Sequence, residues 1–133
     1  MVVDMISYRA DSVRTPPGYS HAMRAGGLLF IAGQVPLDAD GALVGKGDMA
    51  AQARQAFVNL GAVLTAAGAT YRDLVKLTYF VTDIDQVAAI RAVRDEFVDV
   101  GNPPASTLVE VSRLFQPGLL IEVEAIAEVD ASA

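Results

Sequence analysis

The chain has 133 residues, of which 53% are hydrophobic and 20% are charged, and this is typical of one globular domain. Cysteine is absent and there is one histidine, so the sequence excludes disulfides, a cysteine nucleophile and a multi-histidine zinc site. The net charge is −6 and no run of basic residues is present to follow a phosphate backbone, so we expect no nucleic-acid partner.

Membrane and metal partners are also not expected. No apolar stretch approaches the roughly 20 residues that a bilayer span needs, and residues 1–14 lack the continuous apolar segment of a signal peptide. The acidic turn 38–41 has no glutamate at the twelfth position of a calcium loop. We therefore expect a single cytoplasmic domain over residues 1–133 with no metal and no cofactor.

The N-terminal part of the chain is typical of short strands separated by turns. Met5–Arg9 is a weak strand, and Arg14–Gly18 is an extended loop that contains two prolines and a glycine. Ala22–Arg24 and Leu28–Gln34, joined through Gly26-Gly27, predict a β-hairpin.

A long helix follows this hairpin. Asp48 suits the N-cap, and Gly68 stands where a left-handed C-terminal stop is expected. Between them, apolar residues recur at three- and four-residue steps on one face, which predicts an amphipathic helix. These residues are Ala53, Ala56, Phe57, Leu60, Leu64 and Ala67.

The C-terminal half alternates between strands and a second helix. Leu74–Val81 is rich in β-branched and aromatic residues and predicts a strand, after which Asp83 or Asp85 caps a helix. The apolar face of that helix consists of Val87, Ile90, Val93 and Phe97. Two further strands are expected at Ser106–Val111 and Leu119–Val129. The order β-β-β-α-β-α-β-β predicts an α+β two-layer sandwich, a six-stranded mixed sheet with two helices on one face.

Both faces of this sheet are predicted to be apolar. In the hairpin strand, Leu28 and Phe30 alternate with Leu29 and Ile31. In the strand 74–81, one face carries Val75, Leu77, Tyr79 and Val81, and the other carries Leu74, Thr78 and Phe80. Two helices cover only one face, so we expect another copy of the chain to cover the second. The alternative is a monomer whose second face is only patchily apolar.

Two carboxylates lie on the face away from the helices. Ile121, Val123, Ala125 and Ala127 form a continuous apolar face, so Glu122 and Glu124 project from the opposite one, about 7 Å apart. Each carboxylate either forms an ion pair across a subunit interface or holds water or a substrate proton in a cleft.

Other candidate residues have ordinary structural explanations. A lone histidine in a loop, such as His21, is usually a surface residue, and Tyr19 either lines a pocket or packs. Arg91 and Arg94 lie on the polar side of the second helix, where arginines are ordinarily solvated.

Several short motifs follow one another in a recognisable order and spacing. They include Gly33-Gln34-Val35-Pro36, Ala66-Ala67-Gly68, Phe80-Val81-Thr82-Asp83, Pro104-Ala105, Val109-Glu110-Val111 and Ile121-Glu122-Val123-Glu124-Ala125-Ile126-Ala127. In these motifs, and over about residues 17–129, the sequence resembles the reactive-intermediate deaminase family, also called Rid or YjgF. The resemblance implies a chorismate-mutase-like fold and a homotrimer with the sheets facing inward and ligand sites in the clefts between subunits.

The resemblance also implies an activity and a site. Active members hydrolyse 2-imino or enamine acids to 2-keto acids and ammonia. By motif, Tyr19 matches the family tyrosine, Gly33 the cleft glycine and Glu122 the glutamate that positions water. Backbone groups near Gly33 and in the strand that carries Leu108 are expected to help bind the substrate.

The sequence departs from the family at two of these positions. Ser106 stands where an arginine grips the substrate carboxylate. Each charge-assisted hydrogen bond of such a pair is worth about 1.5–3 kcal/mol, so its loss weakens binding by roughly one to two orders of magnitude. Arg91 stands where many members have asparagine, which leaves open a relocated cation.

Three functions are therefore considered. The first is hydrolytic deamination of a small imine or enamine that lacks a carboxylate, with Glu122 orienting water and Tyr19 and Ser106 binding the substrate. The second is a non-catalytic trimeric protein that binds a small molecule of a catabolic pathway. The third, ribonuclease or translation-inhibitor activity, is disfavoured by the acidic charge.

Overall fold

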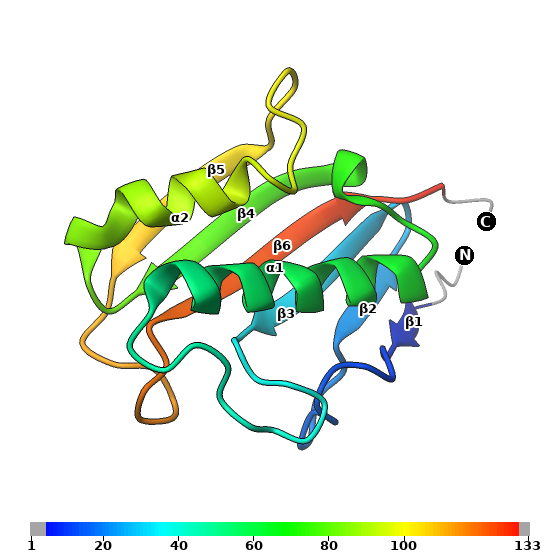
Figure 1. Ribbon diagram of the computed structural model, residues 1–133. Helices are drawn as coiled ribbons and strands as arrows, with labels where there is room; N and C mark the ends of the chain where they lie inside the picture. The colour runs from blue at the N-terminus through cyan, green and yellow to red at the C-terminus, as the bar shows by residue number, and fades with distance from the viewer. Residues whose placement is uncertain (1–4, 131–133) are drawn as a thin grey trace.

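The chain forms a six-stranded sheet with two helices packed on one face (Figure 1), as predicted. This computed structural model describes residues 5–130, and residues 1–4 and 131–133 of the expected 1–133 domain lie outside that range. The strands are β1 (Met5–Tyr8), β2 (Ala22–Ala25), β3 (Leu28–Gln34), β4 (Leu74–Val81), β5 (Ala105–Glu110) and β6 (Ile121–Glu128). The helices are α1 (Met49–Ala66) and α2 (Val87–Arg94), with 3-10 turns η1 (Tyr71–Asp73) and η2 (Ile84–Gln86).

The strand order is β1-β2-β3-β6-β4-β5, and only β4 and β5 are parallel neighbours. A parallel pair needs a crossover connection, and η2 and α2 provide it between β4 and β5. The last strand, β6, therefore lies in the middle of the sheet between β3 and β4, while β5 is left at an edge. No helix within residues 5–130 combines the length and apolarity needed to cross a bilayer.

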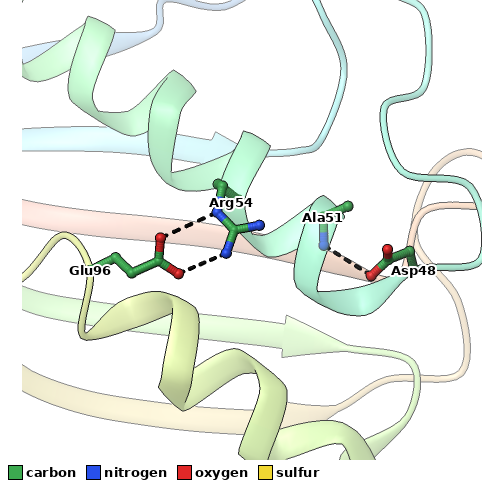
Figure 2. Close-up of polar contacts among 4 residues, drawn as sticks. All are labelled: Asp48, Ala51, Arg54 and Glu96. Atoms are coloured by element: carbon green, nitrogen blue, oxygen red, sulfur yellow. Dashed lines mark hydrogen bonds and ion pairs between the residues drawn. The ribbon is translucent and has the colours of Figure 1, made fainter.

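The ends of α1 are those that the sequence predicts. The Asp48 side chain accepts a hydrogen bond from the backbone N of Ala51 at 3.1 Å (Figure 2), which satisfies one of the free amides of the first turn. At the other end, Gly68 has a φ of 78°, which glycine adopts without strain. Local signals alone therefore set both ends of this helix.

The second helix differs from the prediction at both ends. Asp83 caps η2 through Asp85 N, and α2 begins after Gln86 without a side-chain cap. It ends at Arg94, so Phe97 lies beyond it but still stacks on Phe57, with ring centroids 5.3 Å apart. The packing of an aromatic residue after the helix end explains why the apolar repeat continues to Phe97.

One exposed ion pair joins the two helical segments. Arg54 of α1 donates through Nη2 and Nε to the two carboxylate oxygens of Glu96, at 2.7 and 3.3 Å (Figure 2). Both side chains are about half exposed, with fractions of 48% and 50%. Exposed pairs of this kind contribute little stability, so the packing of the two helical segments depends mainly on their buried side chains.

The core lies between the helices and one sheet face. The β6 residues Ile121, Val123, Ala125 and Ala127 are all buried there, as predicted. The prediction for the first two residues of β4 was wrong, because the β4–β6 register shifts between Leu74 and Lys76. This irregularity turns Leu74 into the core and leaves Val75 45% exposed.

The opposite sheet face, here called the open face, has no covering layer within residues 5–130. Strand pairing places Phe30 opposite Ile126 and Phe80 opposite both Glu122 and Val109 on this face. Its exposed apolar side chains include Leu28, Phe30 and Val109, each 39% or more exposed. The prediction of a largely apolar second face is thus confirmed.

Candidate functional site

Glu122 lies on the open face, directly against the backbone of Gly33. The β3–β6 register shifts between Ile31 and Gln34, so two residues of β3 lie opposite Glu124 alone. A Cβ at position 33 would lie 2.5 Å from Cδ of Glu122, which is closer than real Cβ contacts allow. Glycine is therefore required at position 33 for the Glu122 carboxylate to occupy this place.

The surroundings of Glu122 disfavour its charged form. Burial raises the pKa of this carboxyl above its usual value, and the charge of Glu124 raises it further. No hydrogen-bond donor or cation within residues 5–130 pairs with the carboxylate. A partly buried, unpaired carboxylate with a raised pKa is suited to accept a proton from water. Glu124 is exposed and lines a hollow of the open face with Lys76 and Thr78.

Tyr19 lines a small hollow together with Gly33. The Tyr19 side chain is 45% exposed, so the pocket-lining alternative describes it better than the packed one. Gly33 therefore lies next to two other predicted site residues. It lines the same hollow as Tyr19, and it contacts the Glu122 carboxylate.

The expectation that His21 is a surface residue is wrong. Its side chain is only 2% exposed, and both ring nitrogens are used. Nδ1 accepts a hydrogen bond from Ala10 N at 3.0 Å, and Nε2 lies 2.9 Å from the carbonyl oxygen of Arg14. These contacts make Nε2 the protonated nitrogen and tie the loop before Tyr19 to the sheet.

Two buried amides that the sequence analysis missed support this region. Nδ2 of Asn59 donates to the carbonyls of Val35 and Leu37, each at 2.9 Å, and so holds the chain that follows Gly33. Gln52, also fully buried, makes three backbone bonds to other loops: it donates to Gly45 and Gly118 and accepts from Leu120. One sequence signal could have revealed them: each is an amide residue on the face of a predicted helix that packs on the sheet, and a buried amide needs hydrogen-bond partners.

Ser106, Leu108 and Arg91 come together at a second place. Ser106 pairs with Leu77 and Leu108 with Tyr79, so both face the helices rather than the open face. With Arg91 of α2 they line a hollow of about 500 Å³, here called the α2–β5 hollow. Its other lining residues are Tyr79, Ile84, Val87, Ile90 and Arg94.

The structure therefore divides the six predicted site residues into two groups. Glu122 and Gly33 meet at the open face, with Tyr19 beside Gly33, whereas Arg91, Ser106 and Leu108 line the α2–β5 hollow on the helix-covered side. The sheet lies between Glu122 and the hollow within one chain. No three histidine, aspartate or glutamate side chains in the described residues gather as they would around a metal ion.

These features define a class of protein: a small α+β domain with an uncovered apolar sheet face that carries a carboxylate. The family model described as Endoribonuclease L-PSP matches residues 10–129. The chain therefore belongs to the Rid/YjgF family, which the sequence motifs indicated.

Individual relatives agree with this assignment. A RutC family protein of Pyrococcus horikoshii is 43% identical over 109 residues, which cover 82% of this chain and 85% of the relative. A 2-iminobutanoate/2-iminopropanoate deaminase of Salmonella typhimurium is 38% identical over 111 residues, with 82% and 85% covered. The crystal structure of a conserved Rid family protein of unknown function from Yersinia pestis has a TM-score of 0.89 at 34% identity, covering 95% of this chain and all of that one.

Proposed function

We propose that three copies of the chain assemble through their open faces and bind a small molecule in the clefts between them. Exposed apolar side chains such as Phe30 and Leu28 support this, because a soluble monomer rarely leaves such a face uncovered. The division of the site residues supports it too. Glu122 and Ser106 lie on opposite faces of one sheet, so they can share a ligand only if they come from different copies.

The cleft catalyses the hydrolysis of a small imine or enamine metabolite, and Glu122 activates the water. The observation that carries this proposal is the unpaired, partly buried Glu122 carboxylate against Gly33. Glu122 accepts a proton as the water oxygen adds to the imine carbon. That proton passes to the nitrogen and gives a carbinolamine, which carries a hydroxyl and an amino group on one carbon. The hydroxyl proton then moves to the amino nitrogen through Glu122 as the C–N bond breaks, and the products are a carbonyl compound and ammonia.

The remaining predicted residues bind the substrate. Tyr19 and Ser106 supply hydroxyl hydrogen bonds, Gly33 and Leu108 line the cleft, and Arg91 supplies a cation. The name of the Salmonella relative supports imines as the substrate class. Because Ser106 replaces the carboxylate-binding arginine, turnover of simple 2-imino acids is expected to be weaker than in members that keep it.

The test is ammonia release from imines generated in the assay by an amino acid oxidase, with uncharged imines tested in parallel. Glu122→Gln should lower kcat/KM at least about a hundredfold, which is in the range expected for loss of a general base. Glu124→Gln is the matched control, because it removes a similar carboxylate two residues along β6 and should retain most activity. Turnover that does not depend on Glu122 would remove this proposal.

A non-catalytic binding protein is the second candidate, and Ser106 is the observation that favours it. A serine hydroxyl is a weaker substitute for a guanidinium, so the cleft could retain a ligand without its original chemistry. Native mass spectrometry that finds a co-purified small molecule, together with no turnover on the imine panel, would favour this function over catalysis.

The family description also contains the word endoribonuclease, and the net charge of −6 argues against that activity here. We expect no binding of single-stranded RNA even at low salt. Salt-dependent binding together with strand cleavage that Glu122→Gln leaves intact would reverse this view.

A further inference from the structure

Three aromatic side chains within residues 5–130 are each 45% or more exposed: Tyr19, Phe30 and Phe115. Phe30 belongs to the open face, which the proposed assembly covers. Tyr19 and Phe115 lie on loops, before β2 and between β5 and β6, and Phe115 is the most exposed of the three, at 61%. A single exposed apolar side chain is ordinary, so the position of Phe115 relative to the candidate site decides whether it has a role.

The loop that carries Phe115 is fixed next to the chain segment that follows Gly33. Leu114 packs against the small core cluster that contains Val35, and Val35 follows Gly33 by two residues. The buried Gln52 holds the other end of the loop, close to β6, through two backbone hydrogen bonds. Phe115 therefore has a defined place in the fold, although its own ring is exposed.

Arg14 connects Phe115 to the hollow of Tyr19 and Gly33. The guanidinium carbon of Arg14 lies over the Phe115 ring, 5.5 Å from its centroid, which is within the range of a cation–π interaction. The carbonyl of Arg14 accepts a hydrogen bond from His21, and Arg14 lines the same hollow as Tyr19 and Gly33. One arginine side chain is therefore what separates the Phe115 ring from this hollow.

The dimensions of the hollow limit where a ligand ring can lie. Its volume is about 20 Å³, which is room for about one water molecule, so an aromatic ring cannot enter it. Such a ring must lie across the rim, where Tyr19 and Phe115 are exposed. Because Glu122 lies against Gly33, a substrate whose imine carbon meets Glu122 can extend its side chain along the rim toward Phe115.

We propose that Phe115, held in place by Arg14, stacks on an aromatic ring in the side chain of the substrate, so that the protein selects aryl-substituted imines. This rests on the proposed function and deepens it by naming the substrate class. Phe115 is then a specificity-determining residue and Arg14 a positioning residue. The imines in the name of the Salmonella relative carry only an ethyl or a methyl side chain, which is too short for this contact.

The test measures the binding of three uncharged, unreactive amides by NMR titration: phenylacetamide, cyclohexylacetamide and propanamide. Wild type should bind phenylacetamide about tenfold more tightly than propanamide, because the ring is both buried and stacked. Cyclohexylacetamide has a similar apolar area but no π-face, so it should bind about threefold more weakly than phenylacetamide. The comparison of the two ring compounds separates stacking from simple apolar burial.

Variants of the two residues should change this preference in different ways. Phe115→Ala should reduce the preference for phenylacetamide over propanamide from about tenfold to about twofold, and Phe115→Leu should abolish the advantage of phenylacetamide over cyclohexylacetamide. Arg14→Gln releases the ring and should reduce the preference to about threefold, whereas Arg14→Lys keeps the cation and should retain it. Val58→Ala truncates another exposed apolar side chain, on α1, and should bind all three probes as wild type does.

Turnover and assembly provide two further measurements. The ratio of kcat/KM for the imine made from phenylalanine to that for the imine made from 2-aminobutanoate should fall about tenfold in Phe115→Ala. This variant should sediment as wild type does, because Phe115 lies on a loop outside the sheet. Dissociation of Phe115→Ala would instead place Phe115 in a contact between copies and would overturn the proposal.

The outcomes separate this proposal from the catalytic one. A preference for phenylacetamide that depends on Phe115, without any imine turnover, would support the aromatic site and remove the deaminase function. Glu122-dependent turnover with the same substrate ratio and probe preference in wild type and Phe115→Ala would do the reverse. Absence of measurable phenylacetamide binding to wild type would also overturn the aromatic site.

Discussion

The α-carbon of Gly33 packs directly against the carboxylate of Glu122, so the candidate catalytic group occupies space that any side chain at position 33 would take. Gly33 does not have a positive φ, so its backbone conformation is open to other residues. Space for the carboxylate, and not backbone strain, is therefore the reason for glycine at this position.

Gly33→Ala tests this relationship. The added methyl group should displace Glu122 and lower the free energy of unfolding by about 1–3 kcal/mol, the usual cost of overpacking. In a Glu122→Ala background the same substitution should cost much less, because the atoms it meets are gone. Urea denaturation of the four proteins measures the coupling, and strictly additive effects would contradict the proposed contact.

The pH dependence of activity should follow the Glu122 carboxyl. Burial and the charge of Glu124 both raise its pKa, so the carboxylate required to accept a proton is lost at a higher pH than for an ordinary glutamate. Activity should therefore fall early as the pH decreases. Glu124→Gln removes the repulsion and should move this acidic limb to lower pH. A limb that moves upward would show that Glu122 does not control it, and a limb that stays in place would show that the charge of Glu124 does not raise this pKa.

The open face should control assembly. Phe30→Asp places a charge among the exposed apolar side chains and should convert the proposed trimer to monomers, because burying an unpaired charge is costly. Val58→Asp is the control, since Val58 is similarly exposed, at 48%, but lies on α1. Sedimentation at micromolar concentration measures both. A wild-type protein that sediments as a single chain would contradict the proposed assembly.

His21 should behave as a structural residue. His21→Ala leaves the Ala10 amide and the Arg14 carbonyl without their partner and should lower the free energy of unfolding by about 2–4 kcal/mol. Hydrogen exchange at Ala10 should become faster. Tyr19→Ala, at an exposed position, should change stability by less than about 0.5 kcal/mol. Equal effects of the two substitutions would indicate that the His21 bonds contribute no stability.

Local patterns predicted most of the fold. The hairpin Ala22–Gln34 and helix α1 were predictable because glycine turns, the Asp48 cap and apolar repeats act within a few residues. The failures have non-local causes. Whether Leu74 or Val75 faces the core depends on the register of β4 against β6. The burial of His21 depends on hydrogen bonds to backbone groups 7 and 11 residues away in the sequence.

The same distinction holds for the candidate site. Alternation along one strand was enough to place Glu122 and Glu124 opposite the helix-covered residues of β6, and the family motifs were enough to single out Gly33 and Tyr19. Sequence did not reveal that Tyr79, Arg91 and Ser106 line one hollow, because that depends on how the crossover lays α2 along β5.

The sequence by itself determined the two-layer architecture and the face on which most strand residues lie, because both follow from short-range periodicity and turn chemistry. The tertiary structure decided which of these residues meet. The contact of Gly33 with Glu122 arises from a register shift between β3 and β6, strands separated by most of the chain. Such pairings depend on the packing of the whole sheet, and no local pattern records them.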